Sequence, residues 1–178
     1  LEHVLWFAND PKDAHEDPTF RRSRSHSYVS AEVEAVRNAV GATEIANFAK
    51  HEITGFGSRK FLDYILAGNL PKVGRMALTP MLTPKGKLYG DLTVACMNEE
   101  KFILYGSGVA QEMHRRWFES FLPQEGVNYK NRSDDFHGIA ISGPKSRELL
   151  SRVCREDVSA EVFKFRDVRE TFVGGVPA

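Results

Sequence analysis

Asp91 is the residue whose type and position best suit it to chemistry. It stands in the run Gly90-Asp91-Leu92-Thr93-Val94, a single carboxylate in an otherwise apolar segment that follows a turn, with no adjacent Lys or Arg. A carboxylate in such surroundings needs hydrogen bonds or a ligand to offset its desolvation. An Asp bonded to loop amides at the start of a strand fits this pattern, and so does a functional carboxylate.

The usual motifs for nucleotide, nucleophile and metal sites are missing from the sequence. It contains no GxSxG, no HExxH, no Walker loop and no complete GxGxxG. Gly55-Phe56-Gly57 and Gly106-Ser107-Gly108 carry only part of the dinucleotide pattern, and glycines of this kind are typical of turns. We therefore expect no flavin or nicotinamide site within this segment.

The histidines and the basic cluster point to neither a metal site nor nucleic acid. No two of the 6 histidines are three or four residues apart on a predicted helix, so we expect no metal site. Arg21, Arg22 and Arg24 lack the interleaved aromatic residues that stack on bases, which indicates a solvated arm or a docking surface. Because Lys plus Arg and Asp plus Glu are equal at 24 each, we expect no nucleic-acid or membrane partner.

Length and composition indicate a folded segment rather than a complete flavoenzyme. A chain of 178 residues with 42% hydrophobic residues can form one core or two small lobes, but it is short for a protein that holds both a flavin and a substrate. Cys96 and Cys154 are far apart in the sequence and form no CxxC motif, which favours free thiols in a reducing compartment. With no apolar run of membrane length and no secretory signal, the sequence predicts an intracellular protein.

The elements that would position Asp91 alternate between helix and strand. Residues 1–29 are predicted to be an irregular arm, and a helix capped by Ser30 is expected to bury Val33, Val36, Ala39 and Val40 before Gly41 ends it. A second helix, capped by Ser58, carries an apolar stripe at helical spacing, formed by Phe61, Leu62, Ile65 and Leu66.

Strands are predicted over residues 43–54, 75–82, 87–97, 101–105 and 137–142, with the second and third forming a hairpin across the Pro and Gly of residues 83–86. A helix over residues 109–121 is expected to face inward through Met113, Trp117 and Phe121, and a helix after Gly143-Pro144 through Leu149, Leu150 and Val153. The fold class is therefore α+β, with antiparallel sheets and packed helices in two small lobes.

A series of short motifs between residues 30 and 165 resembles the glycine cleavage T-protein (aminomethyltransferase) superfamily in order along the chain. The motifs are Glu32-Val33-Glu34-Ala35-Val36-Arg37, Val40-Gly41, Phe48-Ala49-Lys50, Ile53-Thr54-Gly55, Phe61-Leu62-Asp63, Asn69-Leu70-Pro71, Gly74-Arg75, Met81-Leu82, Gly86, Gly90-Asp91-Leu92-Thr93-Val94 and Gly143-Pro144. Phe48-Ala49-Lys50, the Asn69-Leu70-Pro71 segment and the single Asp91 in place of paired aspartates are similar to the C-terminal region of dimethylglycine and sarcosine dehydrogenases.

The resemblance implies a T-protein-like folate-binding fold, of which residues 30–178 would be the N-terminal part, with the C-terminal part of the domain lying beyond this chain. It implies that Asp91 contacts tetrahydrofolate and is the catalytic residue, and that Phe48, Leu78, Thr93 and Leu104 line the folate site. Leu78 stands where glycine cleavage T-proteins have a tyrosine.

The implied function is transfer of a one-carbon unit to tetrahydrofolate, giving 5,10-methylenetetrahydrofolate, after a flavin domain has oxidised an N-methyl amine. The FAD would belong to a separate domain, in the same chain or in another subunit, and the location would be the bacterial cytoplasm or the mitochondrial matrix. Two alternatives remain: a glycine cleavage aminomethyltransferase, and a non-enzymatic folate-binding paralogue. The paralogues carry a Lys-Gly-Cys-Tyr-x-Gly-Gln-Glu signature, which is absent here.

Overall fold

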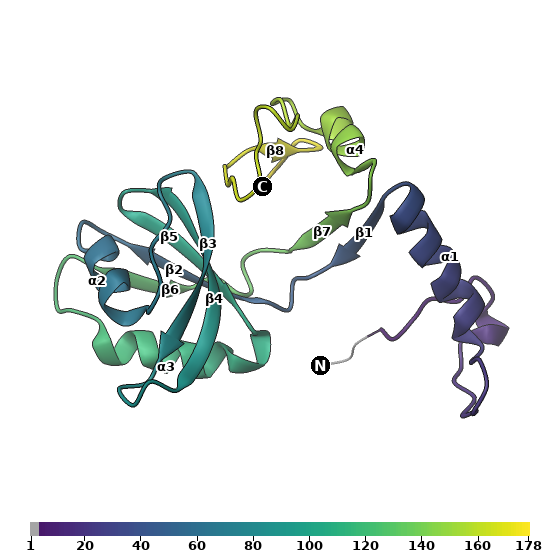
Figure 1. The fold of residues 1–178 in the computed structure, drawn as a ribbon, viewed down its shortest axis with the longest axis horizontal. Coiled ribbons are helices and arrows are strands. Elements are labelled where there is room, and N and C mark those ends of the chain that lie inside the picture. Colours follow the sequence, from purple (N-terminus) through teal and green to yellow (C-terminus); the bar gives the residue numbers. More distant parts are fainter. Residues whose placement is uncertain (1–3) are drawn as a thin grey trace.

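A five-stranded antiparallel sheet is the largest element of the computed structural model, which describes residues 4–178 (Figure 1). Its strands lie in the order β3-β4-β5-β2-β6. Their bounds are β2 Ala49–Thr54, β3 Arg75–Leu82, β4 Leu88–Asn98, β5 Lys101–Gly106 and β6 Asn128–Asn131. The predicted hairpin is β3 paired with β4, and the predicted third strand is β5, so these predictions are confirmed.

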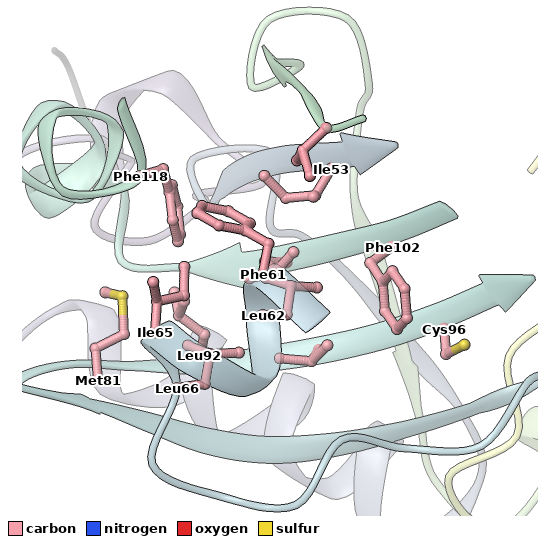
Figure 2. Close-up of a cluster of buried hydrophobic side chains, with 13 residues drawn as sticks. Ile53, Phe61, Leu62, Ile65, Leu66, Met81, Leu92, Cys96, Phe102 and Phe118 are labelled. Atoms are coloured by element: carbon pink, nitrogen blue, oxygen red, sulfur yellow. The ribbon is translucent and has the colours of Figure 1, made fainter. Parts of the chain in front are cut away.

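Helices α2 (Ser58–Ile65) and α3 (Gln111–Phe121) pack on one face of this sheet. Alternate residues of β4, namely Leu92, Val94 and Cys96, are fully buried on that face. They meet the apolar stripe predicted for α2, whose four members are all buried as expected (Figure 2). Strand alternation combined with the helical repeat therefore produces one continuous core.

A second, smaller lobe holds β1 (Gly41–Glu44) paired with β7 (Ile139–Ser142), together with α1 (Ser25–Asn38) and α4 (Ser146–Val153). Strands β8 (Phe172–Val173) and β9 (Val176–Pro177) form a short hairpin, and the 3₁₀ helices are η1 (Pro11–Asp13) and η2 (Gly108–Ala110). In Figure 1, α1 projects away from the large sheet, with β1 and β7 between them. The predicted α+β fold, with antiparallel sheets in two lobes, is confirmed.

Two segments join the lobes, and we call them the first and second connectors. The first connector, residues 45–48, leads from β1 into β2, and the second, residues 132–138, leads from β6 into β7. They meet where the backbone N–H of Ile45 donates to the carbonyl of Gly138, at 2.7 Å. The sequence predicted one strand over residues 43–54, so the first connector corrects it.

In the N-terminal half of the chain, the predicted starts of two helices differ from the structure. Helix α1 begins at Ser25, so Ser30 lies inside it rather than capping it, and none of its residues is buried. Val33 and Val36 of its predicted apolar stripe remain 45% and 36% exposed. Ser58 is the first residue of α2, and its side chain makes no capping hydrogen bond. Residues 1–3 of the predicted arm lie outside the described residues.

The inward faces of α3 and α4 also differ from the prediction. In α3 the buried residues are His114 and Phe118, whereas Met113 and Phe121 are each 38% exposed. Trp117 lies at the margin, with its ring centroid 4.4 Å from that of Tyr89. In α4 no residue is buried, although Leu150 and its neighbours were expected to face inward. Spacing shows that a helix is amphipathic, but the partner surface decides which stripe is covered.

Candidate functional site

The face of the large sheet opposite the helices, which we call the open face, carries a row of four side chains from four neighbouring strands. Leu78 of β3 pairs with Thr93 of β4, Thr93 pairs with Tyr105 of β5, and Tyr105 pairs with Lys50 of β2. Residues directly across from one another in a sheet project to the same side. Leu78 is 67% exposed, and Thr93 and Tyr105 are half-buried.

Asp91 lies on the open face one step along from this row. It is two residues before Thr93, on the same side of β4, and pairs across the strand with Pro80. Its side chain is exposed and makes neither an ion pair nor a hydrogen bond with any of residues 4–178. The structural interpretation, in which loop amides hold this carboxylate, therefore finds no support in the described chain, and Asp91 is free to meet a ligand.

Leu104 does not join Asp91, which corrects the placement implied by the resemblance. It is fully buried and pairs with Val94 and His51, on the face that contacts the helices. Its neighbour Tyr105 points to the open face instead, because successive side chains of a strand alternate between faces. Residues 102–105 are Phe-Ile-Leu-Tyr, without an alternation of apolar and polar residues, so the sequence carries no signal that could have identified Tyr105; strand pairing and burial place it.

Phe48 is the last residue of the first connector and is 46% exposed. It enters β2 two residues before Lys50, whose side chain lies on the open face beside Tyr105. The structure thus brings Leu78, Asp91 and Thr93 together on one face and places Phe48 at the edge of that face. Of the five residues implied by the resemblance, Leu104 alone is excluded from the open face.

Tyr105 and the histidine behind Asp91 have distinct electrostatic settings. The Tyr105 hydroxyl is protonated at neutral pH and can donate a hydrogen bond, and burial raises its pKa further above the ordinary value of 10.0. His114 lies on the helix side, behind glycines 90 and 106; a Cβ at Gly90 would be 2.6 Å from its Nε2. Burial lowers the pKa of His114, with the Asp91 charge opposing the shift. His114 is therefore a neutral core residue and supports the strand from behind.

Within residues 4–178, no three side chains of His, Cys, Asp or Glu are grouped in a way that could hold a metal ion. The same part of the chain contains no helix that is both long and apolar enough to cross a membrane.

Comparisons with known proteins find relatives over most of the chain. The chain is 34% identical to human dimethylglycine dehydrogenase over 99% of its own length, which is 21% of that protein. It is 29% identical to sarcosine oxidase subunit alpha of Rhizobium meliloti over 98% of its length, which is 18% of that protein. It is 30% identical to the aminomethyltransferase of Bacillus cytotoxicus over 85% of its length, or 42% of that protein. The chain thus spans about a fifth of the length of the dimethylglycine dehydrogenase that it matches.

Two solved structures share the fold. The glycine cleavage system aminomethyltransferase T of Bartonella henselae matches with a TM-score of 0.67 and 17% identity, over 80% of this chain and 39% of that chain. A chain of the heterotetrameric sarcosine oxidase of Corynebacterium sp. U-96 matches with a TM-score of 0.64 and 18% identity, over 89% of this chain and 80% of that one. The sequence profile of the GCVT N-terminal domain matches residues 1–178. The chain therefore belongs to the GCVT N-terminal domain family, in the aminomethyltransferase superfamily that its sequence motifs resemble.

Proposed function

We propose that this chain forms part of a tetrahydrofolate-binding domain that accepts a one-carbon unit from an oxidised N-methyl amine. The observation that carries the proposal is the Asp91 carboxylate, exposed and unpaired among the described residues, on a sheet face shared with Thr93, Leu78 and Tyr105. A charged group beside apolar and hydroxyl-bearing side chains suits a flat, polar heterocycle such as a reduced pterin.

Tetrahydrofolate, when bound, would supply the two nitrogens, N5 and N10, that take up the one-carbon unit as 5,10-methylenetetrahydrofolate. Asp91 would orient the pterin through hydrogen bonds and stabilise positive charge as it develops on the reacting nitrogens. Because Asp91 makes no ion pair with the described residues, its carboxylate is available to such a ligand. Removal of that charge is therefore expected to weaken both binding and transfer.

The other side chains of the open face would shape the site. Leu78 and Thr93 would contact one side of the ligand, and Phe48 would offer an aromatic ring at the edge of the sheet. The protonated Tyr105 hydroxyl, at the centre of the row, would donate a hydrogen bond to a ligand nitrogen or oxygen. Because the chain covers about a fifth of its dimethylglycine dehydrogenase relative, further parts of the site would come from polypeptide outside it.

The partner implied by this proposal is a flavin domain, in the same chain or in another subunit, that oxidises a small methylated amine. Support comes from the names of two relatives, dimethylglycine dehydrogenase and sarcosine oxidase subunit alpha. The human relative is named as mitochondrial, and we propose the mitochondrial matrix or the bacterial cytoplasm as the location.

Calorimetric titration of tetrahydrofolate under reducing conditions tests the proposal. We would titrate this chain and the same chain extended to the length of its relatives, each as parent, Asp91→Asn and Asp63→Asn. Loss of a hydrogen bond to a charged group costs about 1.5–3 kcal/mol, so Asp91→Asn should raise the Kd by about 10- to 100-fold. Asp63, an exposed carboxylate on α2, is the matched control and should leave the Kd unchanged.

Binding that weakens in Asp91→Asn alone supports the proposal, whether the short or the extended chain shows it. No binding by the extended parent, or binding that is indifferent to Asp91→Asn, refutes it.

An aminomethyltransferase of the glycine cleavage system is the second candidate. The matches to aminomethyltransferases at 30–31% identity favour it, and Leu78, where the T-proteins have tyrosine, disfavours it. Tetrahydrofolate-dependent release of ammonia from an aminomethylated lipoyl carrier protein would establish this activity in place of the first.

A further inference from the structure

Lys50 is a buried cation that no carboxylate neutralises in the described part of the chain. Its side chain belongs to the row on the open face, beside Tyr105, yet the residue is only 3% exposed. Burial lowers the pKa of its ammonium, with the more distant Glu44 and Asp134 charges opposing the shift. An unpaired ammonium in such a place is unfavourable unless hydrogen bonds replace the lost water.

Three backbone carbonyls provide those hydrogen bonds. The Lys50 Nζ donates to the carbonyl oxygens of Ala46 at 2.8 Å, Phe48 at 2.9 Å and Ser133 at 3.3 Å. An ammonium has three N–H donors and no acceptor, so this set uses its full capacity. A carboxylate partner would remove donors from the carbonyls.

These carbonyls belong to both segments that join the two lobes. Ala46 and Phe48 lie in the first connector and Ser133 lies in the second. Main-chain groups of Lys50 reinforce the contact, since its N–H donates to Ser133 Oγ at 2.9 Å and its carbonyl accepts from the N–H of Arg132 at 2.8 Å. Lys50 is therefore hydrogen-bonded to both connectors.

A close backbone approach restrains the first connector from a different element. A Cβ on Gly108 of η2 would lie 1.9 Å from the carbonyl oxygen of Asn47. The connector thus has little room to move toward η2, and the Lys50 ammonium holds the carbonyls on either side of Asn47. Phe48 is fixed at the edge of the open face by these two restraints together.

We propose that Lys50 is a positioning residue that locks the two connectors to each other and thereby sets the place of Phe48 at the ligand site. Its role as a lock between the connectors stands on the hydrogen bonds alone. Its effect on ligand binding through Phe48 rests on the function proposed above, and the experiments below separate the two.

Amide hydrogen exchange measured by NMR tests the lock without any ligand. The variant is Lys50→Met, which keeps the length of the side chain and removes the ammonium. The control is Lys60→Met, at an exposed position of α2. We expect the amides of Ile45 and Asp135, one in each connector, to exchange about tenfold faster in Lys50→Met alone, with the core amides of β4 unchanged. Unchanged connector amides, faster exchange in one connector only, or equal acceleration throughout the sheet would overturn the proposal.

A second measurement, of the exchange of lysine ammonium protons, uses the parent protein and needs no variant. With ¹⁵N-labelled lysine, the Lys50 ammonium should give a resonance whose protons exchange slowly, whereas exposed lysines lose theirs to solvent. Exchange of the Lys50 ammonium as fast as that of the exposed Lys60 would refute the three hydrogen bonds.

A double-mutant cycle on tetrahydrofolate affinity tests the action through Phe48, in the extended chain. If Lys50 acts through Phe48, then Lys50→Met and Phe48→Ala should each raise the Kd, and the double variant should be no weaker than Phe48→Ala. Additive effects would mean that Lys50 does not position Phe48. If the parent binds no folate, the proposed function fails, and the exchange measurements still decide the lock.

Discussion

Two adjacent residues of β5 should differ in what their substitution changes. Substitution of Leu104 should lower stability, and substitution of Tyr105 should weaken folate binding. Leu104 is fully buried in the core, so Leu104→Ala should lower the free energy of unfolding by about 3 kcal/mol, within the range known for core Leu→Ala changes. Tyr105 is half-buried on the open face, and Tyr105→Phe keeps its ring while removing the hydroxyl. That change should leave stability nearly unaltered and weaken folate binding by about fivefold, the equivalent of one hydrogen bond of roughly 1 kcal/mol.

Urea denaturation and calorimetry on the same samples measure both quantities. With a denaturant slope of about 2 kcal/mol/M, Leu104→Ala should move the midpoint down by about 1.5 M. Folate affinity is then compared in the absence of urea, where both variants are folded, in the extended chain. A Leu104→Ala protein that is as stable as the parent but binds folate poorly would refute the assignment of faces, as would a Tyr105→Phe protein that loses stability and keeps its affinity.

Two further predictions concern the core and the first connector. Burial and the neighbouring His114 lower the pKa of His51 in the folded protein from 6.5 to about 4. Between these pH values the unfolded chain therefore binds more protons than the folded protein does. The free energy of unfolding should fall as the pH falls through this window, by up to about 1.4 kcal/mol per pH unit. Urea melts between pH 7.5 and 5 should show this slope in the parent and in the exposed-site control His137→Gln, and a slope just as steep in His51→Phe would contradict it. Gly108→Ala should displace the first connector, because the new Cβ would clash with the carbonyl oxygen of Asn47. We expect the Ile45 amide to exchange faster with solvent and folate binding to weaken. Wild-type values for both measurements would contradict this prediction.

Several elements were predictable because their information is local. The apolar stripe of α2 has the helical repeat, and the β3–β4 hairpin is marked by Pro84 and Gly86 between two apolar runs. Asp91 stood out for a similar reason, as a lone carboxylate in an apolar strand. By contrast β6, with the sequence Asn-Tyr-Lys-Asn, has no apolar alternation, and its existence depends on pairing with β2.

Helix ends and inward faces were less predictable, because they depend on distant partners. Ser30 has the residue type of a helix cap, but α1 continues through it from Ser25. His114 and Phe118 are the buried residues of α3 because the sheet lies against that stripe, where His114 fits beside glycines 90 and 106. The two glycines stand on the consecutive strands β4 and β5, and the size of that space was defined only when these strands paired and α3 packed against them.

The sequence alone determined the fold class, the family resemblance and the identity of Asp91 as a candidate, since each is written in residue types, local periodicity and the order of short motifs. The tertiary structure alone decided which residues accompany Asp91. Strand register placed Tyr105 on the open face and Leu104 in the core, and folding brought Ser133 to the ammonium of Lys50, 83 residues away along the chain. Register and long-range hydrogen bonds depend on pairings between remote segments, and local sequence patterns do not encode those pairings.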